Sequence, residues 1–249
     1  MQTLLTLIAV LPWGDWAALA CFFASWTGYA HFARRHLGER TSLLATTNLI
    51  RRRWMLQTTR REVRVIDGVV VQNLSTAPSF FASTTILIIG GLLAALGGGD
   101  KATDLVRELP FAARTSVLVF DMKLLVLTGV FVYAFFRFTW SLRQYTFGAL
   151  LVASAPESQE FDTDPTLSRD AFADRAGRVM GLAAETFNDG LRAYYMAFAA
   201  IGWFFSPLVF ALASLGVVWI LYQREFRSDV LTVLSEAEGA TGPGGRPGP

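Results

Sequence analysis

Long apolar stretches separated by charged segments dominate the sequence. The longest run without a charged residue covers Gly68–Gly99, which is 32 residues, and a second covers Ala193–Gln223, which is 31 residues. Runs of 18 or more mostly apolar residues are typical of transmembrane helices. The pattern therefore predicts an all-α integral membrane protein, a bundle of four transmembrane helices. The predicted spans are residues 13–33, 79–97, 117–136 and 197–222.

Two prolines and the position of the first basic residue refine these spans. Pro78 suits the first helical position of the second span. Pro207 lies inside the fourth span, and because proline removes a backbone hydrogen bond it predicts a kink near Trp203. No Lys or Arg precedes Arg34, so the basic segment of a signal peptide is missing and we expect an uncleaved first helix.

The segments between the spans predict long helical extensions. Residues 41–74 contain no proline and only one glycine, Gly68, and predict one long helix. The third span is expected to continue through Phe138–Ser154. A further helix is expected over Thr166–Phe187, with an N-cap at Asp164 and a turn at residues 188–190.

The distribution of Lys and Arg predicts the orientation. The segment 34–78 holds nine of the 22 and the segment 137–192 holds six, whereas the remaining segments outside the membrane hold six together. Positive residues favour the cytoplasmic side. We therefore expect both arginine-rich segments to be cytoplasmic and both termini to be extracytoplasmic, in a bacterial inner membrane. Residues 1–235 are expected to form one domain, and the Gly/Pro-rich residues 236–249 a disordered tail.

Composition and motifs exclude several classes of protein. Hydrophobic residues make up 53% and charged residues only 17%, which excludes an ordinary cytosolic protein. The net charge of +2 gives no support to nucleic-acid binding. Cys21 is the single cysteine, so no intrachain disulfide can form. Hydrolase, metalloprotease and nucleotide-binding motifs are absent, so we expect no enzymatic activity, no cofactor and no metal site.

The most strongly charged segment predicts a site for anions. Arginines beside a cytoplasmic leaflet are stabilised by anionic lipid, and guanidinium groups suit phosphate. The alternative is that these arginines set the topology and solvate one helix face. The candidate lipid or ligand contacts are Arg51, Arg52, Arg53, Arg60, Arg61 and Arg64.

A second candidate site lies inside the membrane. Asp121 and Lys123 are two residues apart in one span, so they point to different helix faces and cannot pair. Intramembrane charges indicate function by default, but Lys123 is close enough to the helix end to snorkel to the headgroups. Arg137, Arg143, Gln144 and Asn188 could line a polar vestibule with them, or form an interfacial belt.

The second span carries small residues at four-residue spacing. Gly90, Ala94 and Gly98 form one such series. Because small residues let helix backbones approach closely, we expect a helix–helix contact at Gly90.

Several ordered sequence blocks resemble one protein family. The chain is similar over about residues 15–228 to the domain-of-unknown-function family five-nine-nine, multi-pass membrane proteins of bacteria and plants. The resemblance implies a helical membrane protein. It implies no particular activity, cofactor or catalytic residue. The blocks are TTNLIRRRWM (46–55), FFASTTILIIGGL (80–92), FDMKLLVL (120–127), FFRFTWSLRQY (135–145), FNDGLRAYYMA (187–197) and REFRS (224–228).

Two functions fit these observations. The first is a structural or accessory subunit, or scaffold, of a membrane assembly, with lipid, a second copy or other membrane subunits as partners. The alternative is a small oligomeric transporter or channel with its pathway near Asp121, Lys123 and Arg137. The intramembrane charges are few and close to helix ends, which favours the first.

Overall fold

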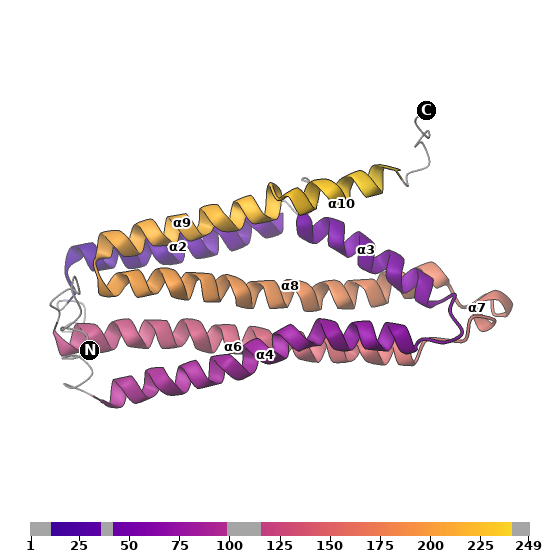
Figure 1. Cartoon of the computed structure of the whole chain (residues 1–249), viewed down its shortest axis with the longest axis horizontal. Helices are drawn as coiled ribbons and strands as arrows, with labels where there is room; N and C mark the ends of the chain where they lie inside the picture. The colour runs from indigo at the N-terminus through magenta and orange to yellow at the C-terminus, as the bar shows by residue number, and fades with distance from the viewer. Residues whose placement is uncertain (1–10, 36–41, 99–115, 241–249) are drawn as a thin grey trace. The chain divides into compact units, whose positions relative to one another are not determined.

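The computed structural model describes residues 11–35, 42–98 and 116–240, and within these residues the chain is helical without strands (Figure 1). This confirms the predicted all-α class. The helices are α2 (Trp13–Arg35), α3 (Leu43–Thr58), α4 (Val65–Gly97), α6 (Val117–Ala153), α7 (Glu160–Thr163), α8 (Arg169–Ile201), a 3-10 turn (Gly202–Phe204), α9 (Pro207–Phe226) and α10 (Asp229–Ala240).

Three stretches of helix in the described part of the chain are long and apolar enough to cross a membrane. They are Val65–Gly97, Val117–Ala153 and Pro207–Leu234. Helix α2 forms where the first span was predicted, but it is not among these three. The apolar runs therefore support a membrane protein, while the predicted set of four spans is not reproduced.

The chain forms two compact units. Unit 1 comprises Met1–Phe32, Phe80–Phe138 and Asn188–Ile220, and unit 2 comprises the remaining segments. In unit 1, aromatic side chains pack together, for example Trp203 stacked on Phe210 at 5.1 Å between ring centroids.

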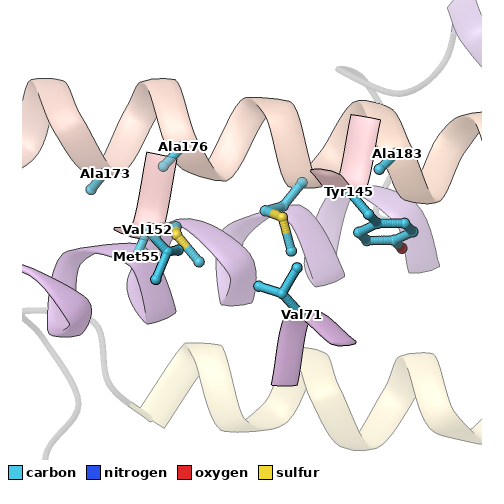
Figure 2. Packing of buried hydrophobic residues seen from close by; sticks show 8 residues of the cluster. Met55, Val71, Tyr145, Val152, Ala173, Ala176 and Ala183 are labelled. Atoms are coloured by element: carbon cyan, nitrogen blue, oxygen red, sulfur yellow. The ribbon is translucent and has the colours of Figure 1, made fainter. Parts of the chain in front are cut away.

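Unit 2 has its own apolar core, contributed by α3, α4, α6 and α8 (Figure 2). Three of the four α8 residues in this core are alanines, so at these positions the helix packs closely against its neighbours. Its buried members are Met55, Val71, Tyr145, Val152, Ala173, Ala176, Met180 and Ala183.

The single helix predicted over residues 41–74 is wrong, because the chain leaves the helix between Thr58 and Val65. The hydroxyls of Thr58 and Thr59 donate to the backbone oxygens of Trp54 and Leu56, at 3.1 and 2.7 Å. Such side-chain bonds to the backbone compete with the helical pattern. Helix α4 then runs without interruption through Pro78, which is buried inside it and does not begin a span.

The fourth predicted span is also divided. Helix α8 continues through residues 188–190, where a turn was predicted, and ends at Ile201. The chain then reverses direction at the 3-10 turn before α9 begins at Pro207 (Figure 1). Pro207 therefore starts a new helix, where its missing N–H is tolerated, and the predicted kink near Trp203 is a complete break.

The close helix contacts occur at other glycines than the one predicted. A Cβ at Gly90 would meet no described atom within 4 Å, so the predicted contact there is not found. By contrast, a Cβ at Gly177 would lie 3.0 Å from the Cα of Arg52, and one at Gly181 would lie 2.8 Å from Asn48 Oδ1. The four-residue spacing of Gly177 and Gly181 lets α3 approach α8 closely in unit 2.

The C-terminal helix belongs to the unit that contains the first arginine-rich segment. The backbone N–H of Leu44 donates to Glu225 Oε1 at 3.1 Å, and α10 contacts α3. The two segments therefore pack together in unit 2, which does not fit their predicted placement on opposite sides of the membrane. Helix α10 extends to Ala240, so the predicted disordered tail is helical over 236–240, and residues 241–249 lie outside the described part.

This grouping predicts the labelling of two cysteines. In a Cys21→Ser background, cysteines introduced at Gln57 and Gly239 should react from the same side of the membrane with an impermeant maleimide. We expect both to be protected in intact cells and both to react after permeabilisation. Labelling of one but not the other in intact cells would contradict the structure.

Candidate functional site

The predicted arginine cluster does not act as one group. Arg52 forms ion pairs with Asp174 and, at 3.1 Å, with Asp170, both on α8. The hydrogen bond from Arg52 to Asp174 is the main reason that the pKa of Arg52 is raised. Because all three side chains are exposed, these pairs contribute little to stability. Arg53 and Arg60 also have exposed side chains.

Arg64 donates hydrogen bonds to backbone oxygens. Its guanidinium donates to the carbonyls of Thr58 at 3.2 Å, Ala155 at 2.5 Å and Pro156. Arg169, which the sequence did not single out, donates in the same way to the carbonyl of Thr59 at 2.5 Å. These two arginines satisfy carbonyls that the ends of α3 and α6 leave without helical partners.

Asp67 is the central acid of unit 2, and the sequence analysis did not single it out. Its side chain is fully buried. Its Oδ1 atom accepts from Trp54 Nε1 at 2.7 Å, from Thr58 Oγ1 at 3.1 Å and from Arg61. The second oxygen, Oδ2, is buried and has no partner among the described residues. Its position as an acid in the first turn of α4 is the feature from which the sequence analysis could have identified it.

Arg51 is bound by neutral side chains, whereas Arg52 and Arg61 pair with carboxylates. Its guanidinium donates to Thr47 Oγ1 at 3.0 Å and Asn48 Oδ1 at 2.9 Å, and no carboxylate of the described residues pairs with it. Burial lowers the pKa of Arg51, although a guanidinium remains charged at neutral pH. Arg51 and Arg61 both line a cleft of about 440 Å³ between α3 and the start of α4.

Lys123 is buried in unit 1 and does not snorkel. It is only 3% exposed, its Nζ donates to the carbonyl oxygen of Trp203 at 2.8 Å, and it lies 5.5 Å from the centre of the Trp203 ring. The indole Nε1 of Trp203 donates in turn to buried Asp15 at 2.5 Å. Lys123 and Asp15 are thus joined through one tryptophan. Asp121 is half-buried.

Arg137 belongs to a second buried charge cluster in unit 1. It pairs with Asp189, which also accepts from Arg192 at 3.1 Å. Arg192 lies over the ring of Tyr29, 5.5 Å from its centre. The Nε atom of Arg137 is buried without a hydrogen-bond partner in the described chain. The sequence did not identify Asp189, although an acid three residues before an arginine on one helix is a recognisable pair.

The remaining candidates of the intramembrane site are divided between the two units. Asn188 is half-buried in unit 1, whereas Arg143 and Gln144 belong to unit 2. Arg143 is exposed, and Gln144 Oε1 is buried without a partner among the described residues. In the described ranges, no three His, Cys, Asp or Glu side chains come together as metal ligands.

The two charges of the third predicted span should differ in their effect on stability. Lys123→Leu leaves the carboxylate of Asp15 buried without its neighbouring cation, so we expect a loss of about 1–3 kcal/mol. Asp121→Leu removes a half-buried carboxylate and should cost less. Thermal unfolding of both variants in one detergent measures the difference. Adding Asp15→Asn to Lys123→Leu should recover part of the loss, and a larger loss for Asp121→Leu would contradict this account.

Comparison with known proteins identifies the family and nothing narrower. The family model described as "Protein of unknown function, DUF599" matches residues 17–230, which is most of the chain. No curated protein and no solved structure matches it. The match covers Arg51, Asp67, Lys123 and Asp189, whereas Asp15 lies just before it. The chain therefore belongs to the DUF599 family.

Proposed function

We propose that this protein is a non-enzymatic scaffold or accessory subunit of a membrane assembly, in a bacterial inner membrane. In this proposal unit 1 is the membrane anchor and unit 2 is a cytoplasmic platform that binds a neighbouring subunit. The observation that carries the proposal is an exposed apolar surface on unit 2.

That surface lies where α3 is connected to α4. Val63, Val65, Ile66 and Val69 are 71%, 70%, 70% and 54% exposed. Neighbouring exposed aliphatic side chains are typical of a protein interaction site. We call these four residues the apolar tip, and the exposed Arg60 lies beside them in the sequence. A partner with an apolar surface and acidic residues at its edge fits them best.

The charges of unit 1 favour an anchor over a pathway. A transport route needs polar groups that face a solvent-filled space. Here Arg137 and Arg192 share the carboxylate of Asp189, and Lys123 is bound to the backbone of Trp203. These contacts stabilise the packing of the helices. They also occupy the charged side chains that would otherwise bind a transported ion.

The proposed arrangement also revises the topology. Among its described residues, unit 1 contains five helical segments, taken from α2, α4, α6, α8 and α9. If each of the five crosses the membrane, the C-terminus lies on the opposite side from the N-terminus and on the same side as the arginine-rich segments. The positive-inside rule then makes that side cytoplasmic.

Photo-crosslinking and flux measurements test the proposal together. A photoreactive amino acid at Val65 should give a discrete adduct with another protein in intact cells, and the same group at exposed Thr166 should not. Proteoliposomes of the wild-type protein should show no flux of protons, potassium or chloride above protein-free liposomes.

Either of two results would contradict the scaffold role. One is the absence of any adduct that depends on position 65. The other is a saturable flux that Asp189→Asn abolishes while the thermal unfolding temperature is unchanged, which would support the transporter alternative.

A further inference from the structure

The cleft between α3 and α4 has the features of a ligand site. Its volume of about 440 Å³ lies in the range of small-molecule sites. Its apolar lining residues are Ile50, Ile66, Val70 and Leu74. Two guanidinium groups, a carboxylate and an indole also line it, from Arg51, Arg61, Asp67 and Trp54. A lining that combines apolar side chains with a few polar groups suits an amphiphilic molecule.

The charges of the cleft define the head group of that molecule. Arg61 is paired with Asp67, whereas Arg51 has only the neutral partners Thr47 and Asn48 in the described chain. The lining therefore carries one uncompensated positive charge. A carboxylate monoanion neutralises it and can bind a guanidinium through two oxygens. A phosphate dianion would leave a negative charge beside buried Asp67.

Asp67 indicates a second polar group on the ligand. All three of its hydrogen bonds use Oδ1, and the buried Oδ2 has no donor among the described residues. A buried acceptor without a partner costs free energy comparable to a lost hydrogen bond. Because Oδ2 has no accessible surface, the ligand reaches it only when the cleft opens at Asp67, and a hydroxyl next to the ligand's carboxylate then supplies the missing donor.

We propose that this cleft binds a small apolar hydroxy acid as its anion. The carboxylate binds Arg51 and Arg61, the hydroxyl donates to Asp67, and the apolar body lies against Ile66, Val70 and Leu74. This site adjoins the surface proposed for the scaffold role, because Ile66 belongs to both the cleft and the apolar tip, whereas Arg51 and Asp67 belong to the cleft alone. If both hold, binding of the acid gives the platform a means to respond to a metabolite.

Calorimetric titration of the protein in zwitterionic lipid nanodiscs tests the proposal. The probes are α-hydroxyisocaproate and phenyllactate, the corresponding acids without the hydroxyl, isoamyl alcohol and inorganic phosphate. We expect at least one hydroxy acid to bind about tenfold more tightly than its hydroxyl-free analogue, since one hydrogen bond to a charged group is worth about 1.5–3 kcal/mol. The alcohol and phosphate should bind more weakly still.

Matched variants separate a specific site from general attraction to a basic surface. Arg51→Met and Ile66→Glu should abolish binding. Arg53→Met, on the same helix, and Val63→Glu, at an equally exposed valine outside the cleft, should retain it. Because Ile66 is 70% exposed, its replacement tests the cleft without depending on the core.

Four results would overturn the proposal. They are no binding by either hydroxy acid at millimolar concentration, equal affinity for the hydroxyl-free acids, tighter binding of phosphate, or binding that survives both Arg51→Met and Ile66→Glu. None of these readouts depends on crosslinking at Val65, so failure here is distinguishable from failure of the scaffold role.

Discussion

The buried carboxylate of Asp67 is the interaction on which unit 2 depends. A fully buried acid is tolerated only when donors surround it. Trp54 and Thr58 provide two of these donors from α3, and Arg61 provides the third from the connection that follows. These bonds hold the end of α3 against the start of α4. The turn, the cleft beside it and the exposed position of the apolar tip all follow from that arrangement.

The same constraint organises unit 1. Asp189 lies between Arg137 and Arg192, and Asp15 is joined to Lys123 through the Trp203 side chain and backbone. Each acid is satisfied by groups that are distant in the sequence or on a neighbouring turn. Charges in an apolar interior therefore serve here as fixed contacts between helices. This is the physical reason for assigning an anchoring role to unit 1 and the recognition role to unit 2.

The sequence predicted what depends on local composition and missed what depends on distant partners. Apolar runs predicted the helical class and the long α6, which continues to Ala153 as expected. The break after Thr58 was missed because Arg64 and Arg169, the latter more than a hundred residues away, satisfy the carbonyls exposed there. Helical spacing alone also could not distinguish Gly90, which meets open space, from Gly177, which meets Arg52. The burial of Lys123 likewise depends on the turn at Trp203.

Hydrogen exchange of α3 tests the central role of Asp67 most directly. Asp67→Leu keeps a side chain of similar size but leaves the Trp54 indole N–H without its acceptor and Arg61 without its carboxylate, at a cost of about 1–3 kcal/mol. Asp170→Leu removes an equivalent acid that is exposed on α8. The account predicts that amides of Leu43–Thr58 exchange about ten- to a hundredfold faster in Asp67→Leu and remain near the wild-type rate in Asp170→Leu. Equal protection of α3 in the two variants would contradict it.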